Sequence, residues 1–183
     1  MTDRVNEHNR KLHPTATISG TAAALAEWMA RTSSDGLHEP YADLDEVAAA
    51  LGPDHSLSDI ENAAEELSSY GLLDFSRYIG GGAVKPGWRL FAVVDPHEKG
   101  WILEQDARTL ASIVLDVQDS FSASELEQRS GFERRRFNPA FSRLLTLFDP
   151  ESVINEIQPN YPATCAYLSG GTRARLRRFV KGE

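Results

Sequence analysis

Cysteine is almost absent from the sequence, because Cys165 is the only one among 183 residues. A single thiol excludes an intramolecular disulfide and cannot build a thiolate metal site. In the strand predicted around it, Cys165 is most simply a small buried hydrophobic residue. A hydrophobic signal segment and a long apolar run are also lacking, so we expect a cytoplasmic protein without a membrane partner.

Motifs of catalysis and of nucleotide binding are missing as well. None of the five histidines stands at a zinc-ligand spacing from another His, a Cys or an acid, and the serines include no GxSxG elbow. The glycines Gly80 to Gly82 match neither GxGxxG nor GxxxxGK[ST], so they predict a flexible loop tip. We therefore expect a protein that is not an enzyme and that holds no metal and no cofactor.

A net positive charge is also lacking, since the formal charge is −8. This argues against wholesale binding to nucleic acid or to an anionic membrane. The charge is uneven, however. Through Glu104, eight Lys and Arg face seventeen acids, whereas from Gln105 onward eleven Lys and Arg face ten acids. The second half is therefore the only plausible place for a polyanion.

The most informative stretch present is SASELEQRSGFERRRFNPAFSRLLTLF, residues 122–148. Ser122 and Glu125 have the spacing of a capping box, which predicts the start of a helix with Leu126 as its core anchor. Gly131 provides the permissive backbone of a turn. A second helix with an apolar stripe follows. It leaves on or near its exposed side Arg134, Arg135, Arg136 and Arg143.

Pro139 leaves two versions of this second helix open. A helix from Glu133 to Phe148 would be kinked at the proline, at a cost of roughly 3 kcal/mol or more. Alternatively, Asn138 is the N-cap and Pro139 is the first helical residue, so that the arginines lie in the preceding turn. In both versions they lie where a helix-turn-helix meets a phosphate backbone.

The first half of the chain predicts an arm, three helices and a ribbon. Residues 1–18 show no periodic apolar pattern and are predicted to be a flexible N-terminal arm. One helix begins at Ser19 or Thr21, and LLDFSRYI and WRLFAVV are predicted to be two strands around the glycine-rich loop GGGAVKPG. The other two helices are predicted from capping-box spacings, which are Asp43 with Glu46 and Ser58 with Glu61.

Three helices followed by a two-stranded ribbon is the element order of a winged helix. The segment DLDEVAAALG…SLSDIENAAEELSSYGLLDFS resembles the second and third helices and the first wing strand of winged-helix proteins. The order repeats with a helix opened by Asp106, the stretch 122–148, strands in SVINEIQ and ATCAYLS, and a closing helix in GGTRARLRRFV. The resemblance implies a mainly α fold with small β-hairpin wings (α+β). It comprises two tandem winged-helix domains, an acidic one at 19–98 and one with a basic recognition region at 99–183.

One function that this resemblance implies is a DNA-binding transcription regulator. Its arginines would pair with phosphates or guanine edges of double-stranded DNA, because the planar guanidinium matches both. Alternatively, these arginines are solvent-exposed charge, or they pair with the acidic first domain. The predicted DNA-binding residues are Arg134, Arg135, Arg136, Arg143, Arg173, Arg175, Arg177 and Arg178.

The other function is a protein-interaction module. The third helix of the first domain carries no Lys or Arg, so phosphates would repel it, and it is predicted to bind a protein partner or a second copy of the chain. Tandem acidic winged helices also resemble accessory subunits of bacterial condensin complexes, in which such domains grip a partner chain. Both functions combine if the first domain docks a partner while the second holds DNA. The predicted partner-binding residues are Asp59, Glu61, Glu65 and Glu66.

Overall fold

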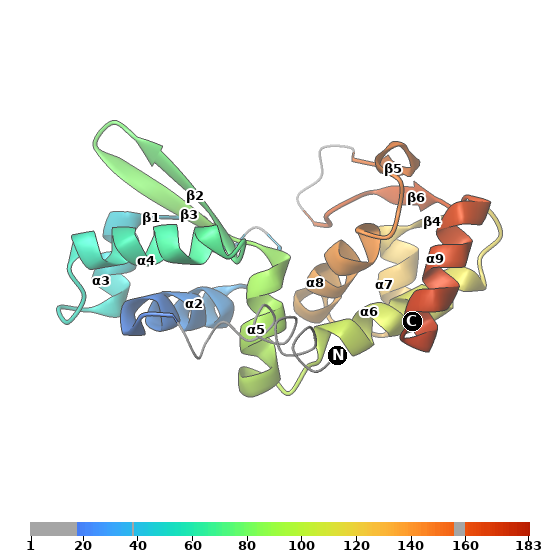
Figure 1. Ribbon diagram of the computed structural model, residues 1–183, viewed down its shortest axis with the longest axis horizontal. Helices are drawn as coiled ribbons and strands as arrows, with labels where there is room; N and C mark the ends of the chain where they lie inside the picture. The colour runs from blue at the N-terminus through green and yellow to red at the C-terminus, as the bar shows by residue number, and fades with distance from the viewer. Residues whose placement is uncertain (1–17, 38, 156–159) are drawn as a thin grey trace, which may run out of the picture. The chain divides into compact units, whose positions relative to one another are not determined.

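The computed structural model describes residues 18–37, 39–155 and 160–183 of the chain. In this part of the chain α-helices predominate, and the strands form two three-stranded antiparallel sheets (Figure 1). The prediction of a mainly α fold with small β elements is therefore confirmed as a mixed α+β class. The predicted N-terminal arm, residues 1–18, lies outside the described residues apart from Ile18.

Two compact units divide the chain. Unit 1 consists of Met1–Ser34 and His38–Gly100, and unit 2 consists of Asp35–Leu37 and Trp101–Glu183. Each unit has its own cluster of buried apolar side chains, and the two clusters share no residue. The short segment Asp35–Leu37 is thus part of a unit whose other residues lie far along the chain.

In unit 1, as far as the chain is described, three helices and a short strand precede a hairpin and a further helix. The elements are α2 (Gly20–Thr32), β1 (Ala42–Asp43), α3 (Leu44–Leu51), α4 (Leu57–Ser69), β2 (Leu73–Tyr78), β3 (Gly81–Pro86) and α5 (Trp88–Glu98). The sheet order is β1–β3–β2, and the β2–β3 hairpin extends beyond the helices (Figure 1). Fully buried core side chains include Leu25, Met29, Ile60, Leu67 and Phe91.

The segment WRLFAVV is helical, so its prediction as a strand was wrong. The second hairpin strand is instead Gly81–Pro86, within the predicted loop. Gly80 makes the tight turn possible because its φ is +91°, a region that favours glycine. A Cβ on Gly82 would lie only 2.7 Å from the Phe75 ring, so the hairpin needs glycine there. The buried residues of α5 follow helical spacing and include Leu90, Phe91, Val93 and Val94.

Two predicted capping boxes in unit 1 were also wrong. The cap of α4 is Ser56 rather than Ser58, in a reciprocal capping box with Asp59. Asp43 occupies the N-cap position of α3, but its side chain makes no capping hydrogen bond. It accepts a hydrogen bond from the Tyr78 hydroxyl instead, at 2.5 Å. Tyr78, which is distant in sequence, has therefore taken the place of the local backbone N–H as the partner of Asp43.

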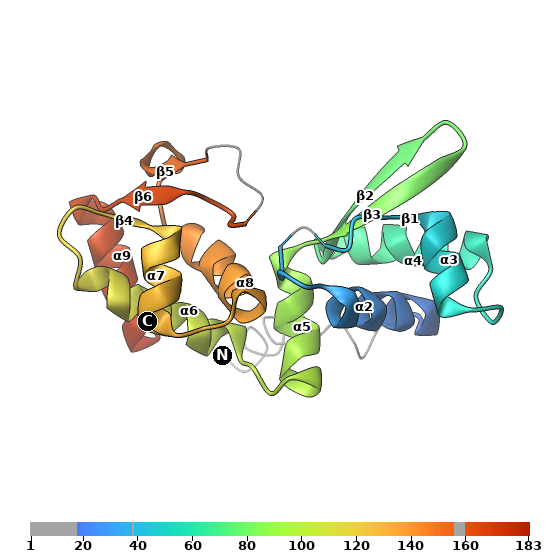
Figure 2. The same ribbon diagram turned by 180° about the vertical axis from the view of Figure 1, so that it is seen from behind.

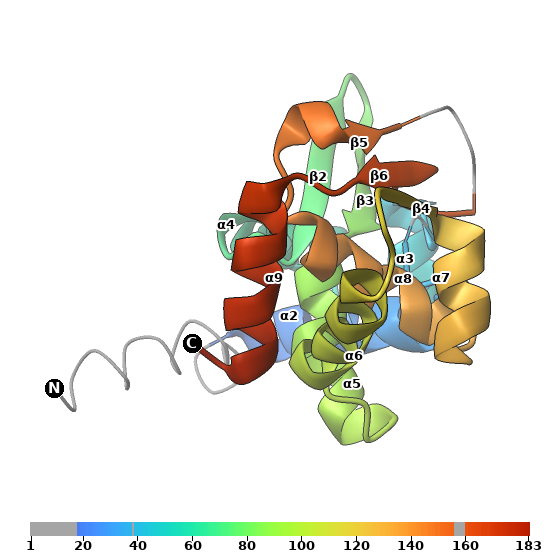
Figure 3. The same ribbon diagram turned by 90° about the vertical axis from the view of Figure 1, so that its right-hand side faces the viewer.

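In unit 2 the described helices accompany a second small sheet. The elements are α6 (Leu103–Leu115), β4 (Ser120–Ser122), α7 (Ala123–Ser130), α8 (Arg134–Leu145), the 3-10 turn η2 (Pro150–Ser152), β5 (Val153–Ile154), β6 (Cys165–Tyr167) and α9 (Gly170–Lys181). The sheet order is β4–β6–β5, and Figure 2 shows α7 following directly on β4. Helix α6 packs against α8 and α9, and Figure 3 shows α9 beside it.

Local predictions for the helix at 123–130 are confirmed. Ser122 and Glu125 form the capping box of α7, Leu126 is buried, and Gly131 ends the helix in the left-handed conformation. Two other predictions in this unit were wrong. Helix α6 begins at Leu103 instead of Asp106, and Cys165 is only partly buried.

Pro139 lies inside α8, which excludes the alternative in which the helix starts after Asn138. A proline has no N–H to donate to the carbonyl of Arg135, four residues earlier. That carbonyl lies against Gly36, since a Cβ on Gly36 would be only 2.5 Å from it. The segment Asp35–Leu37 thus packs where the proline interrupts the helical hydrogen bonding.

Both units repeat one element order. Helix, strand, helix, helix, strand, strand and helix follow one another in each, apart from the added turn η2 in unit 2. In both sheets the third strand lies between the first and the second. Throughout the described ranges, no helix is long and apolar enough to cross a membrane.

Candidate functional site

Two arginines of α8 that were predicted to contact DNA lie against carboxylates of α6. Arg136 donates two hydrogen bonds to Asp106, at 2.9 and 2.7 Å. Arg143 donates two to Glu104, at 3.0 and 3.1 Å. Each guanidinium thus directs the two N–H groups of its planar fork at a carboxylate. A phosphate would need the same two N–H groups.

The pair of Arg136 with Asp106 is the more buried of the two. Asp106 is only 4% exposed, and its negative charge is compensated by Arg136. The hydrogen bond to Asp106 raises the pKa of Arg136 above its ordinary value. The guanidinium also lies over the Phe132 ring, 4.4 Å from the centroid, an arrangement that favours a cation. Arg136 is therefore fixed in place from two sides.

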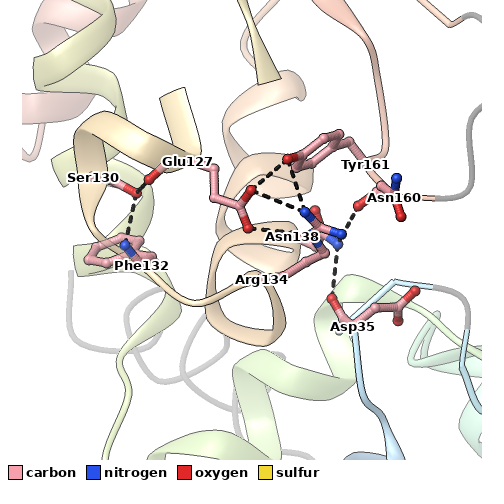
Figure 4. Close-up of polar contacts among 8 residues, drawn as sticks. All are labelled: Asp35, Glu127, Ser130, Phe132, Arg134, Asn138, Asn160 and Tyr161. Atoms are coloured by element: carbon pink, nitrogen blue, oxygen red, sulfur yellow. Dashed lines mark hydrogen bonds and ion pairs between the residues drawn. The ribbon is translucent and has the colours of Figure 1, made fainter. Parts of the chain in front are cut away.

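Arg134 belongs to a second polar cluster, shown in Figure 4. Two of its nitrogens lie 3.4 Å from the carboxylate of Glu127 on α7. The Tyr161 hydroxyl donates to Glu127 at 2.5 Å and accepts from Arg134 at 3.2 Å. Burial, followed by the hydrogen bond to Glu127, raises the pKa of Tyr161. The cluster joins α7, α8 and the segment before β6.

Arg135 is buried, with 7% exposure, so its predicted position on the exposed side of the helix was wrong. Its guanidinium lies 5.8 Å from the ring centroid of Trp101. Of the twelve residues of α8, those that are buried include this arginine together with Phe137, Pro139 and Phe141. A helix placed so deeply in its own unit presents little of its surface to a groove of DNA.

The predicted arginines at the start of α9 bind carbonyl groups of unit 2. Arg173 donates to the carbonyl of Val117, just after α6, at 2.8 Å. Arg175 donates to the carbonyl of Leu147 at 2.7 Å and pairs with Asp149 at 2.8 Å. Cations near a helix end satisfy carbonyls that lack an intrahelical partner, so both arginines have structural roles.

Arg177 and Arg178 differ from the other predicted DNA-binding residues. Both are exposed on α9. Within the described part of the chain, neither guanidinium makes a hydrogen bond or an ion pair. The structure therefore brings Arg134, Arg136 and Arg143 together with acids and leaves these two available to solvent.

Asn138 is a side chain whose role sequence reasoning missed. It is fully buried, and its Nδ2 donates to the backbone carbonyls of Asp35 at 2.9 Å and Asn160 at 3.0 Å (Figure 4). A buried amide bonded in this way holds two separate segments against α8. The one available signal was a polar residue on the apolar side of the helix, three positions before Phe141.

Two acidic residues predicted to bind a partner lie on α4 beside Arg77 of β2. Glu61 and Glu65 bind this arginine at 3.0 and 2.6 Å. All three side chains are well exposed, so the pairs contribute little to stability. One cation faces two anions here, which leaves the surface negative.

The other two predicted acidic residues have different contacts within unit 1. Asp59 closes the capping box of α4 with Ser56, and the hydrogen bonds from Ser56 lower the pKa of Asp59. Glu66 accepts a hydrogen bond from the backbone N–H of Ser19 at 3.0 Å. Both acids therefore lie at helix starts, Asp59 at that of α4 and Glu66 at that of α2.

A groove of about 330 Å³ lies beside the hairpin tip of unit 1, at the first turns of α3 and α4. Leu57 and Tyr78 in its walls are 47% and 51% exposed, and Ile79 at the adjacent turn is entirely exposed. Sequence reasoning missed this site, although an isoleucine directly before three glycines was an available signal. The groove is lined by Leu44, Asp45, Leu57, Glu61, Arg77, Tyr78, Gly80, Gly81 and Gly82.

Removing the Asp43 carboxylate is expected to lower the pKa of Tyr78. The hydrogen bond to Asp43 raises that pKa to about 12, because ionisation would place a phenolate beside a carboxylate. In the Asp43→Asn variant the pKa should fall toward its ordinary value of about 10. Absorbance titration of tyrosinate measures it, and Tyr78→Phe identifies which transition belongs to Tyr78. A transition that does not move in Asp43→Asn would contradict the contact.

The hydrogen bond between Tyr78 and Asp43 also makes the stability of the folded protein depend on pH. The pKa of Tyr78 is raised in the folded protein, so the stabilisation from this hydrogen bond is fully present below about pH 10 and is lost toward about pH 12. Asp43→Asn should remove that dependence between these two pH values. Unfolding in urea at several alkaline pH values measures it.

Among the residues that the structure describes, no group of three or more His, Cys, Asp or Glu side chains is placed to hold a metal ion. In comparisons with known proteins, no family model, no curated protein and no solved structure matches the chain.

Proposed function

We propose that the chain is a tandem winged-helix protein that works as a non-enzymatic protein-interaction module. The element order of both units supports the fold, since three helices with one short strand precede two strands and a closing helix. The sheet order, with the third strand in the middle, is the same in both. Because winged helices serve many roles, the function is argued from the surfaces.

The pairing of the α8 arginines inside unit 2 carries this proposal. Electrostatic binding to DNA comes from cations that neutralise phosphates and release counterions. Arg134, Arg136 and Arg143 already neutralise carboxylates of their own unit. To reach a phosphate, Arg136 would leave Asp106 buried without its counter-charge, and breaking a buried pair costs up to about 3–5 kcal/mol.

The net charges of the two units support the same conclusion. Unit 2 has eleven Lys and Arg against twelve acids, and unit 1 has eight against fifteen, which gives −1 and −7. Neither unit has the excess of positive charge that is typical of a DNA-binding domain. Unit 1 instead combines negative charge with exposed Leu57, Tyr78 and Ile79, and exposed apolar groups rimmed by polar ones mark protein-interaction surfaces.

We expect the purified protein to show no salt-dependent binding to DNA. Fluorescence anisotropy with a labelled random-sequence duplex, at low and at moderate salt, measures this. The variant Glu104→Gln is a matched probe, because it removes the carboxylate that binds Arg143 and should increase DNA affinity over the wild-type protein. Binding by the wild-type protein that weakens steeply with salt would overturn the proposal.

A direct test of the module is co-purification. The tagged full-length chain, isolated from its own cells with nuclease treatment, should retain a protein partner in stoichiometric amount. A chain that retains no protein with nuclease treatment, and only nucleic acid without it, would contradict the proposal. Light scattering of the pure chain determines in the same material whether a second copy is the partner.

DNA binding by α9 remains the second candidate function, because Arg177 and Arg178 are exposed and their guanidinium groups are free of carboxylates within the described chain. In this version the second unit holds DNA while the first binds a partner. The double variant Arg177→Ala with Arg178→Ala should then reduce the salt dependence of DNA binding by about two units of slope, one per lost phosphate contact.

A further inference from the structure

We propose that the groove beside the β2–β3 hairpin of unit 1, here called the hairpin groove, docks a peptide segment of a partner protein. The segment carries a large apolar side chain flanked by lysine or arginine. This inference rests on the proposed protein-interaction function and adds the site and the chemistry of the occupant. Shape, apolar exposure and charge each support it.

The walls of the hairpin groove are held in position before any partner binds. The Tyr78 hydroxyl is bonded to Asp43 at 2.5 Å, which fixes the tyrosine along the groove. Gly81 lies so close to this ring that a Cβ there would be 3.0 Å from it, and a Cβ on Gly82 would be 3.1 Å from Leu44. The glycines therefore let the hairpin pack closely on its neighbours. A wall fixed in advance reduces the entropy lost on binding.

Large apolar side chains are exposed in and beside the hairpin groove. Leu57 and Tyr78 are each about half exposed within it, and Ile79 beside it is entirely exposed. Burying one such aliphatic side chain contributes about 1.5–3 kcal/mol. The volume of about 330 Å³ is at the lower end of ligand pockets, roughly 300 Å³. One large apolar side chain can enter the groove while the rest of the segment covers Ile79.

The charge around the hairpin groove selects a basic partner. Asp45 and Glu61 line it, and Asp43 lies directly behind Tyr78. The one cation in the lining, Arg77, is already bound by Glu61 and Glu65. A segment with lysine or arginine on both sides of its apolar residue would meet this negative rim, and such complementarity gives specificity and speeds association.

The charge of the whole unit disfavours the other occupants. Unit 1 has a net charge of −7, so a second copy would bring like charges together, and DNA would be repelled. A basic peptide gains from the same field. The mode of binding is then an apolar anchor in a pocket with charged residues at the rim.

The test is a selection of peptides from a random phage-displayed library on the full-length protein. Enriched peptides should carry an apolar residue flanked by Lys or Arg. A labelled synthetic copy should bind the wild-type protein in fluorescence anisotropy. Tyr78→Ala and Asp45→Lys should each weaken that binding by about tenfold or more, the loss expected for a central tyrosine or a charge reversal at a binding site.

Matched controls separate the hairpin groove from the rest of unit 1. Tyr70→Ala removes a tyrosine that is exposed to a similar extent, 45%, and Asp54→Lys reverses an exposed acid, both outside the groove lining. Both variants should bind like the wild-type protein. Circular dichroism and thermal unfolding of every variant confirm that it is folded.

The outcomes distinguish this inference from the function on which it rests. The proposal that the hairpin groove docks a peptide would be overturned if peptides bound Tyr78→Ala and Asp45→Lys as well as the wild-type protein. It would also be overturned if no peptide were enriched. A partner that still co-purifies with both variants would then keep the protein-interaction module intact. Enriched peptides that are acidic would also overturn the stated chemistry of the occupant.

Discussion

Replacing Asn138 by aspartate is expected to lower the free energy of unfolding of unit 2 by about 3–5 kcal/mol, the cost of an uncompensated buried charge. The side chain is fully buried, and Nδ2 donates to the carbonyls of Asp35 and Asn160. An ionised aspartate of nearly the same shape has no hydrogen to donate. The carboxylate oxygen in the place of Nδ2 would face both carbonyl oxygens in a site that water does not reach.

The measurement is urea unfolding followed by the fluorescence of Trp101. Replacing Trp28 and Trp88 of unit 1 by phenylalanine leaves Trp101 as the reporter of unit 2. The control Asn138→Ala removes the donors without adding a charge, so it should cost less, about 1–3 kcal/mol for unsatisfied buried partners.

The pH dependence of the aspartate variant provides a second check. Burial raises the pKa of the new carboxyl above about 3.9, its unfolded value. The variant should therefore lose stability relative to the wild-type protein as the pH rises from about 3.9 through the raised pKa of the folded state. It should regain stability at lower pH, where the protonated group can donate one hydrogen bond. A loss below about 1 kcal/mol at neutral pH, a fraction of the penalty for one unsatisfied group, would contradict the buried position of Asn138.

The features of the fold that could be predicted are those that a few neighbouring residues determine. The capping box of Ser122 with Glu125 requires only two side chains three positions apart, and it is present. Gly131 is equally local, since a left-handed residue ends the helix and glycine adopts that conformation at no steric cost. Such signals do not depend on the rest of the chain.

The failures share a different cause. The run WRLFAVV is short and apolar, and such a run cannot be assigned to a strand or a helix by its own pattern. Its helical form is decided by burial of Phe91 and its neighbours in the core of unit 1. Asp43 shows the same effect at a cap. The hydroxyl of Tyr78, thirty-five positions away, donates to the carboxylate that local spacing assigned to the backbone N–H of Glu46.

The candidate site shows how far charge alone can be interpreted. One of the two versions that the sequence left open placed the arginines on the helix after the turn, and α8 does carry Arg134, Arg136 and Arg143. What it could not give is their partners, since Asp106 and Glu104 lie thirty or more positions earlier on α6. The sequence analysis considered only DNA, solvent or the acidic first domain as the surroundings of these arginines. Pairing with acids of the same unit was not among them.

Replacing Phe137 by alanine is expected to lower the free energy of unfolding of unit 2 by about 3–5 kcal/mol, the typical cost of truncating a buried aromatic ring. Phe137 is fully buried, and its ring contacts those of Phe141 and Tyr161, with centroids 5.2 and 5.8 Å apart. The cavity also removes the packing support of Tyr161, which binds Glu127 and Arg134. The polar cluster of Figure 4 should loosen together with the core.

The control for this prediction is Phe91→Ala, which creates the equivalent cavity in unit 1. Phe91 is also fully buried, and the two core clusters have no residue in common. Unfolding reported by Trp101, with Trp28 and Trp88 replaced, should therefore shift with Phe137→Ala. Unfolding reported by Trp28 and Trp88, with Trp101 replaced by phenylalanine, should shift with Phe91→Ala. Equal shifts of both reporters in either variant would mean that the two cores unfold as one cooperative unit. Partner binding at the surface proposed for unit 1 would then depend on the packing of α8, and variants in either unit would alter it.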